Sequence, residues 1–382
     1  MSQGVHDHRL RELAAGHLDH HRVLGFAREH GVPLVSDDRV TFIYYGAAEQ
    51  VHLRHWIYGL PGHQPFSRVG ETDLWFREVE LPENSRVEYK IEVVKDGHGH
   101  WLLDPLNPRR AHDPFGANSV CHGVGYVRPE WTLPQPGTRE GTLDAVRLKS
   151  HAFGTERIVP LYLPARFRKT GRYPLLVVHD GSDYVEYASL KVVLDNLIDR
   201  LEIPPLIAAL SNPADRLVEY PGDPRHARHL TEELVPHLEA KLPVVRRPDA
   251  RGIVGASFGA VASLYTAWRY PGFYGRMLLQ SGSFAFTDIG PHHRSREFDP
   301  VVNFINAFRK DPGKPAERAF VSCGTYESLI YENRSMMPFF QRIGLDVRFV
   351  EARDGHNWEN WRDRLREGLS WLFPGPLWMT YE

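Results

Sequence analysis

Cysteine is scarce in this chain. The 382 residues include only two, Cys121 and Cys323, which lie far apart along the sequence. Two distant thiols cannot form the several cross-links that stabilise small secreted domains. The sequence therefore argues against a disulfide framework and is compatible with a reducing compartment.

Long hydrophobic runs are absent as well. No apolar stretch approaches the roughly 20 residues that a helix needs to cross a bilayer. Residues 1–11 are polar and lack the apolar centre of a secretory signal. We expect a cytoplasmic protein without a membrane partner.

Neither sign of charge dominates the composition. The chain has 46 Lys and Arg against 48 Asp and Glu, a formal net charge of −2, and 42% hydrophobic residues. Such a balance provides no long-range attraction for nucleic acid or for an anionic membrane. The composition is typical of a globular protein whose partners are defined by local sites.

The length and one unusual segment predict two domains. A chain of 382 residues exceeds one ordinary domain. Residues 133–141 are rich in proline and glycine and have little to bury, which is typical of a linker. We predict a first domain at residues 1–135, a linker at 136–142 and a second domain at 143–382.

The first domain has the pattern of a small β-sandwich. A helical lead-in is expected at about residues 9–30, and after it β-branched and aromatic residues alternate or cluster in short segments separated by turn residues. These segments are residues 40–45, 50–56, 74–81 and 87–94.

The second domain has the rhythm of an α/β fold. Short apolar runs at residues 175–178, 206–210, 277–279, 319–321 and 347–350 alternate with segments of helical periodicity at 184–200, 226–242 and 328–343. This alternation predicts a mostly parallel sheet with helices on both faces.

A five-residue motif carries the strongest chemical signal. Gly255-Ala-Ser257-Phe-Gly259 lies between an apolar run and a helix-like segment. A serine in such a strand-to-helix turn has its hydroxyl exposed above the sheet, and glycines let the neighbouring backbone pass closely. We predict Ser257 to be a nucleophile.

A serine nucleophile needs an imidazole to accept its proton and a carboxylate to orient that imidazole. Glu327 follows the predicted strand at 319–322, and His356 follows the strand at 347–351 and precedes a helix. The order serine, acid, histidine is that of the α/β-hydrolase arrangement. Asp354 is an alternative acid, but its position on the histidine's own loop favours Glu327. Ser281 and Ser283 also follow a strand but lack flanking glycines.

Two backbone N–H groups should stabilise the oxyanion. One is that of Phe258, at the start of a helix, and the other that of Gly181 or Ser182, after the strand at 175–178. The segment Asp180-Gly181 could equally be an ordinary tight turn.

A polar cluster after the strand at 206–210 includes Arg216 and Glu219. It either binds substrate or holds its loop through an Arg216–Glu219 ion pair. We assign Asp180, Arg216, Glu219 and Trp358 to substrate binding, and we expect no metal or organic cofactor.

Two further groups have alternative interpretations. His17, His20 and His21 could be metal ligands, but we expect a solvated helix surface. Three tryptophans of the first domain could form a platform that stacks on sugars, but on alternating strands we expect them to face the core. They are Trp56, Trp75 and Trp101.

At these motifs the chain resembles a known family. Gly-Ala-Ser257-Phe-Gly, Gly-Thr-Tyr-Glu327 followed by Glu332-Asn-Arg, and Gly-His356-Asn-Trp-Glu-Asn-Trp are similar to the esterase D and enterochelin esterase group of α/β-hydrolases, which includes feruloyl esterase domains. Segments at residues 31–35, 40–42, 73–76 and 101–108 resemble the N-terminal immunoglobulin-like domain of enterochelin esterases.

The resemblance implies an α/β-hydrolase fold preceded by an immunoglobulin-like sandwich. It implies Ser257 as nucleophile, His356 as base and Glu327 as its partner. In the family an Arg-x-x-Glu-Leu segment lines the site, and here Tyr220 replaces the leucine. Siderophore esterases hold a negatively charged catecholate with basic residues, and no such cluster is identifiable in this sequence.

The sequence thus predicts a two-domain serine esterase that acts on a small-molecule ester through an acyl-enzyme. Three alternatives remain: an acyltransferase, an aryl or feruloyl-type carbohydrate esterase, and a ligand-binding protein on a degenerate scaffold. The first domain is expected to shape the mouth of the cleft or to promote a homodimer.

Overall fold

The computed structural model describes residues 8–15, 17–288 and 294–375, and the chain divides into two compact units. The first unit comprises Met1–Val127 with two short segments, Thr325–Glu327 and Ala352–Asn357. The second comprises Arg128–Gly324, Ser328–Glu351 and Trp358–Glu382. Two loops from the C-terminal half of the chain therefore belong to the N-terminal unit.

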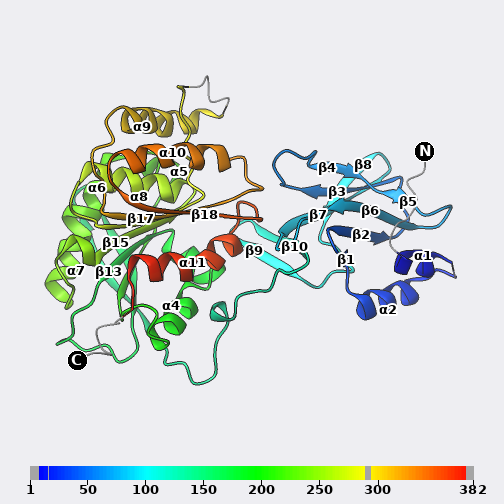
Figure 1. Cartoon of the computed structure of the whole chain (residues 1–382), viewed down its shortest axis with the longest axis horizontal. Helices are drawn as coiled ribbons and strands as arrows, with labels where there is room; N and C mark the ends of the chain where they lie inside the picture. The colour runs from blue at the N-terminus through cyan, green and yellow to red at the C-terminus, as the bar shows by residue number, and fades with distance from the viewer. Residues whose placement is uncertain (1–7, 16, 289–293, 376–382) are drawn as a thin grey trace. The chain divides into compact units, whose positions relative to one another are not determined.

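The first unit is a sandwich of two antiparallel sheets (Figure 1). The four-stranded sheet has the order β1 (Leu34–Ser36), β2 (Arg39–Tyr45), β6 (Leu74–Glu80) and β5 (Ser67–Arg68). The six-stranded sheet has the order β4 (His63–Pro65), β3 (Gln50–His55), β7 (Arg86–Lys95), β10 (Gly116–His122) and β9 (Arg110–Asp113), with β8 (His98–Leu102) beside β7.

Every second residue along these strands faces the sandwich core. Phe42 of β2, Leu53 of β3 and Tyr89 of β7 are buried in one cluster. Ile43, the next residue along β2, instead packs with helices α1 (His8–Ala14) and α2 (His20–His30). The predicted all-β first domain is confirmed, and the predicted helical lead-in consists of two short helices outside the sandwich.

The second unit is built on an eight-stranded sheet of order β11-β12-β14-β13-β15-β16-β17-β18. Adjacent strands from β14 to β17 run parallel, whereas β11 and β12 form an antiparallel pair, which the sequence analysis missed. The bounds are β11 (Thr142–Ser150), β12 (Thr155–Leu163), β13 (Leu175–His179), β14 (Ile207–Ser211), β15 (Arg251–Ala256), β16 (Arg276–Gln280), β17 (Arg318–Gly324) and β18 (Asp346–Ala352).

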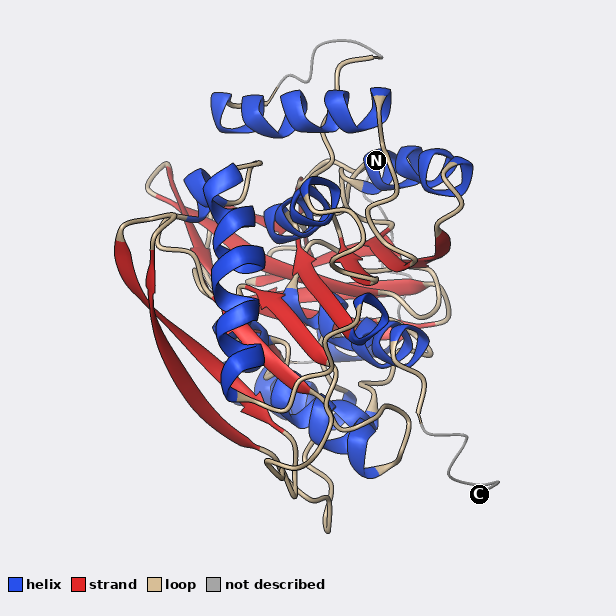
Figure 2. Cartoon of the chain, turned by 90° about the vertical axis from the view of Figure 1, so that its left-hand side faces the viewer, coloured by secondary structure: helices blue, strands red, loops and turns tan. Residues whose placement is uncertain are grey.

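Helices cover both faces of this sheet (Figure 2). One face packs against α7 (Val235–Lys241), α8 (Phe258–Arg269), α9 (Asp299–Lys310) and α10 (Ile330–Arg342). The other packs against α3 (Gly181–Tyr187), α4 (Leu190–Asp199) and α11 (Trp358–Leu372). The short helices α5 (Arg216–Glu219) and α6 (Pro224–Arg228) follow β14.

Burial on both faces explains the continuous apolar runs of the sequence. In β13, Val177 belongs to one core cluster and Val178 to the other. A strand that packs helices on both sides cannot alternate with polar residues. The predicted mostly parallel α/β sheet is confirmed.

The segment before β11 is attached to α4. The side-chain amide of Asn196 donates hydrogen bonds to the carbonyls of Trp131 and Leu133, and the Gly141 N–H donates to Asp195. Residues 136–142, which we predicted as a linker, thus make contacts within the second unit. The predicted boundaries at 135 and 143 stay predictions.

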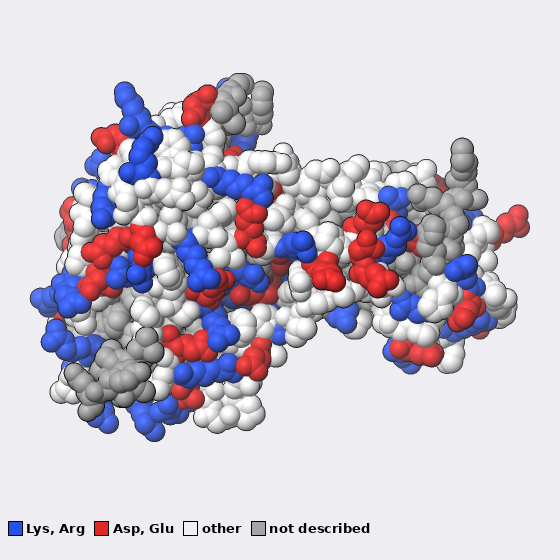
Figure 3. All heavy atoms as spheres, viewed as in Figure 1, with Lys and Arg blue, Asp and Glu red and all other residues white. Residues whose placement is uncertain are grey.

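Charges of both signs are interspersed on the face of the molecule drawn in Figure 3. Among the residues that the structure describes, no helix is both long and apolar enough to cross a membrane.

Candidate active site

Ser257 stands in a strained turn between β15 and α8. Its backbone has φ +57° and ψ −122°, a conformation that L-residues rarely adopt. A Cβ on Gly255 would lie 2.1 Å from the Gly259 carbonyl oxygen. The turn therefore needs glycine at 255 for a steric reason, and the strand–turn–helix context predicted for the motif is present.

The hydroxyl of Ser257 is partly exposed and has one described side-chain partner. Its Oγ lies 3.3 Å from Oγ of Ser283, in the turn after β16. Ser281 of the same turn is buried and accepts a hydrogen bond from Nε1 of Trp361. Ser283 thus adjoins the candidate nucleophile, whereas Ser281 supports the core.

Two helix N-termini supply candidate oxyanion donors. Phe258 is the first residue of α8 and Gly181 the first of α3. Neither N–H donates to another described residue. The N–H of Ser182, the other predicted candidate, donates to Oδ1 of Asn212 at 3.0 Å. Because the Ser182 N–H already has an acceptor, we favour the Gly181 N–H as the second donor to the oxyanion.

Glu327 and His356 form a hydrogen-bonded pair. Nδ1 of His356 lies 2.7 Å from Oε2 of Glu327, whose side chain is fully buried, while the histidine side chain is 38% exposed. The Thr325 N–H donates to the carbonyl of Ala352, so the carboxyl ends of β17 and β18 are adjacent. A buried carboxylate at Nδ1 fixes the ring in the tautomer whose Nε2 can accept a proton.

Asp354, the alternative acid, is used elsewhere. Its carboxylate accepts hydrogen bonds from Arg86, Asn357 and the Gly355 N–H. Burial raises the pKa of Asp354 to about 7, although Arg86 opposes the change. Of the two acids that we considered, Glu327 is the partner of His356 in the structure.

Arg216 connects the loops around Ser257. Its Nε donates to Oδ2 of Asp180 at 3.0 Å, and its Nη2 lies 3.4 Å from the carbonyl of Ala256. Burial raises the pKa of Asp180 above its ordinary value, even with the Arg216 guanidinium beside it. The hydroxyl of Tyr220 accepts the Asp180 N–H at 2.9 Å, which gives a role to the tyrosine that replaces the family's leucine.

Of the two alternatives for the polar cluster, the Arg216–Glu219 ion pair is not what the structure shows, since Arg216 pairs with Asp180. Glu219 instead accepts hydrogen bonds from Arg157 at 2.9 Å and from the Ala214 N–H, and it lies 3.3 Å from Nδ1 of His226. Burial opposes its ionisation, but the bonds from His226 and Arg157 lower the pKa of Glu219 to about 2. Because its side chain is only 5% exposed, we interpret Glu219 as a buried anchor, and its assignment to substrate binding stays a prediction.

Comparison with known proteins identifies the family. A family described as "Putative esterase" matches residues 150–372. The chain belongs to this esterase family. The match contains β12 to α11 and therefore every candidate catalytic residue.

Relatives of this esterase extend the likeness into the first unit. The chain is 26% identical to the iron(III) enterobactin esterase of Dickeya dadantii, over 90% of this chain and 91% of the relative. It is 24% identical to that of Escherichia coli K12, over 83% and 85%. The ferric enterobactin esterase structure from Salmonella typhimurium has a TM-score of 0.72 at 20% identity, covering 87% of this chain and 93% of its own, and supports the fold.

Trp358, which we assigned to substrate binding, lies in the core of the esterase's second unit. It is 9% exposed, and its ring packs among aromatic residues of the core. Its ring neighbours are Tyr184, Tyr187 and Trp361. Trp358 thus packs at the start of α11, and its assignment to substrate binding stays a prediction.

Sequence analysis missed part of the support beneath the candidate oxyanion loop. Nε2 of His179 lies 3.0 Å from Nε2 of His226, and Nδ1 of His179 lies 2.9 Å from Oγ of Ser263 in α8. Burial, together with His226, lowers the pKa of His179 well below its ordinary value. No local sequence motif indicates this buried network of side chains, because its residues come from three separate elements.

One cluster in the esterase's first unit could hold a metal. Among the described residues, ligand atoms of His52, His63 and Glu92 lie within 4.8 Å of one another. Arg54, however, donates to both carboxylate oxygens of Glu92. The Arg54 guanidinium already neutralises the Glu92 carboxylate, so we interpret the cluster as an ion-pair network.

The other residues with alternative interpretations also have defined positions. His17, His20 and His21 are exposed, which agrees with the predicted solvated surface. Trp75 is buried in the core as predicted, but Trp56 and Trp101 are about half exposed, and for these two the prediction is wrong.

Proposed function

We propose that this esterase cleaves a carboxylic ester through an acyl-enzyme formed on Ser257. The observation that carries the proposal is the strained backbone of Ser257 at the junction of β15 and α8. Strain of this kind persists where it presents a reactive side chain. Glu327 and His356 follow β17 and β18 of the same sheet, which supports their action as the proton-transfer pair.

In the proposed reaction Ser257 Oγ attacks the ester carbonyl carbon while Nε2 of His356 accepts its proton. The buried Glu327 carboxylate stabilises the imidazolium that forms. The N–H groups of Phe258 and Gly181 hydrogen-bond the oxyanion. His356 returns the proton to the departing alcohol, and a water molecule, deprotonated by the same ring, releases the acid.

Arg216 and Asp180 are proposed to hold the oxyanion loop. Asp180 precedes Gly181, and Arg216 joins it to the carbonyl of Ala256, next to the nucleophile. The Arg216 side chain is 37% exposed, so its guanidinium can also attract an anionic substrate.

The proposed substrate class is a siderophore ester. The support is that curated iron(III) enterobactin esterases match over both units of the chain. A solved ferulic acid esterase covers 62% of this chain with a TM-score of 0.52 at 18% identity, a likeness that supports the fold alone.

The test compares hydrolysis of p-nitrophenyl, feruloyl and catecholate esters by the wild type and by Ser257→Ala. We expect the variant to lose turnover and labelling by a fluorophosphonate while it keeps the circular dichroism of the wild type. Normal turnover in Ser257→Ala would refute the mechanism. Adding an alcohol and analysing the products separates hydrolysis from acyl transfer, since a transferase yields the new ester.

The cytoplasmic location and the homodimer stay predictions. The two cysteines are buried free thiols, which agrees with a reducing compartment. Light scattering of the purified chain tests the assembly state.

A further inference from the structure

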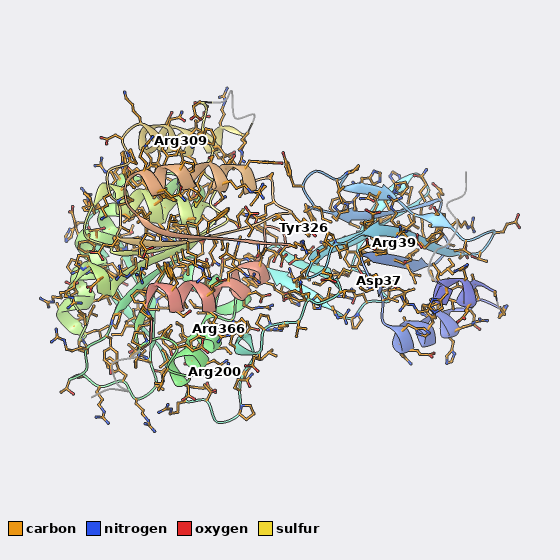
Figure 4. All side chains as sticks on the ribbon, viewed as in Figure 1. Asp37, Arg39, Arg200, Arg309, Tyr326 and Arg366 are labelled. Atoms are coloured by element: carbon orange, nitrogen blue, oxygen red, sulfur yellow. The ribbon has the colours of Figure 1, made fainter. Side chains whose placement is uncertain are left out.

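The loops that carry Glu327 and His356 are fastened to the β-sandwich within the first unit. The N–H of Arg86, at the start of β7, donates to the carbonyl of Arg353 at 2.9 Å. The N–H of Tyr58 donates to the carbonyl of Tyr326, which Figure 4 labels, at 2.8 Å. Arg353 lies three residues before His356, and Tyr326 directly precedes Glu327. Each bond therefore holds a residue close in sequence to one member of the Glu327–His356 pair.

The Arg86 side chain holds the histidine loop by its guanidinium. It is fully buried, and its Nη1 donates to Oδ1 of Asp354 at 3.2 Å and to Oδ1 of Asn357 at 2.9 Å. Its Nη2 donates to Glu88 at 2.8 Å. Asp354 precedes His356 by two residues, and Asn357 follows it directly.

The histidine loop is folded around the Asp354 carboxylate. Oδ1 accepts the Gly355 N–H at 2.7 Å and Nδ2 of Asn357 at 2.8 Å. A buried carboxylate with one cation and several donors is satisfied in one geometry only, so the backbone of the loop has little freedom.

Ser85 holds the loop of the acid. Its hydroxyl shares a hydrogen bond of 2.5 Å with the hydroxyl of Tyr326, the residue before Glu327. Ser85 is fully buried. Two consecutive residues of the sandwich therefore hold both loops, Ser85 the one with Glu327 and Arg86 the one with His356.

We propose that Ser85 and Arg86 are positioning residues that fix the Glu327–His356 pair for proton transfer. The proposal rests on the proposed function, because it assigns His356 as the base. A base must stay within hydrogen-bond reach of the proton that it takes, and a misplacement of about 1 Å can cost roughly 100-fold in rate. The sandwich is then part of the catalytic apparatus.

The test measures kcat and KM of the full chain for Arg86→Met and for Arg86→Met combined with Asp354→Asn. The double variant removes the carboxylate charge that the single variant leaves buried without its cation. We expect kcat to fall roughly 10- to 100-fold in both, the loss that removing the support of a functional residue produces. KM should stay within about threefold, because neither residue contacts substrate in the proposed reaction.

Arg68→Met is the matched control. It deletes an exposed Arg–Asp ion pair with Asp73 in the same unit, and we expect unchanged kcat. Ser85→Ala should lower kcat as well, and Arg86→Lys should recover part of the loss, because lysine keeps the charge but not the fork of donors.

A spectroscopic measurement separates positioning from stability. The Nδ1 proton of His356 should give a low-field proton NMR signal, assigned by its loss in His356→Ala. We expect the signal to shift or broaden in the double variant and to stay unchanged in Arg68→Met. Thermal unfolding of each variant shows how much protein is folded at the assay temperature.

Wild-type kcat in the folded double variant and in Ser85→Ala would overturn the proposal. So would a loss of kcat that unfolded protein fully accounts for. If Arg86→Met does not fold, Ser85→Ala and Arg86→Lys decide in its place. Turnover retained by Ser257→Ala would instead contradict the proposed function, so the two failures are distinguishable.

Discussion

Replacing Glu219 by glutamine tests whether this carboxylate is a buried anchor. Lowering its pKa from 4.5 to about 2 corresponds to about 3 kcal/mol of stabilisation at neutral pH, at about 1.4 kcal/mol for each pKa unit. Removing one partner of a buried ion pair gives a similar figure, about 3–5 kcal/mol. Here Arg157, with a side chain 13% exposed, would lose its charged partner.

The sign of the pH dependence follows from the direction of the shift. Because the pKa is lower in the folded protein, the stabilisation is present above about pH 4.5 and is lost as the pH falls towards about 2. Glu219→Gln should therefore be less stable than the wild type at pH 7, and the two should converge in acid.

Scanning calorimetry between pH 7 and pH 3 measures this difference. At pH 7 we expect the unfolding midpoint of the second unit to fall by roughly 6–12 °C, at about 2–4 °C for each kcal/mol. Glu156→Gln is the matched control, because its ion pair with Arg147 is exposed and should contribute at most about 1 kcal/mol. A midpoint difference that is absent at pH 7, or that is equally large at pH 3, would refute the reasoning.

Three further predictions concern the candidate active site. Glu327→Gln should lower kcat by roughly 10³- to 10⁴-fold, because an amide cannot stabilise the imidazolium; steady-state kinetics measure this, and a loss below tenfold would contradict the role. Gly255→Ala should lower the unfolding midpoint more than Gly259→Ala. The new Cβ would lie 2.1 Å from a backbone oxygen in the first variant but 3.2 Å from a side-chain carbon in the second. Calorimetry measures both midpoints, and equal values would contradict the steric argument. Tyr220→Phe removes the acceptor of the Asp180 N–H and should cost about 1 kcal/mol of unfolding free energy; denaturant titration checks it, and an unchanged free energy would show that the bond contributes nothing.

The α/β sheet could be predicted because strands that are buried on both faces consist mainly of apolar residues. β13, for example, is buried at every position and is apolar up to its last residue, His179. The antiparallel pair β11 and β12 was missed because β11 is largely exposed, with charged residues such as Arg147, and β12 begins with exposed residues that include Glu156. Exposed, charged segments of this kind have no apolar pattern that separates them from a polar loop.

In the site, residues next to a strand end could be predicted, and contacts between distant segments could not. Ser257, Glu327 and His356 each come after a strand of the same sheet, as the apolar runs of the sequence predicted. Arg157 lies on β12, and nothing in its neighbourhood indicates that it pairs with Glu219. Analysis of each sequence segment by itself therefore yields candidates for the reacting groups but does not identify the side chains that anchor their loops.

The hydrogen bonds from Ser85 and Arg86 to Tyr326 and Asp354 connect residues about 240 to 270 positions apart. A substitution at one end of such a bond leaves the polar group at the other end without its partner, so we expect these positions to co-vary among homologous enzymes.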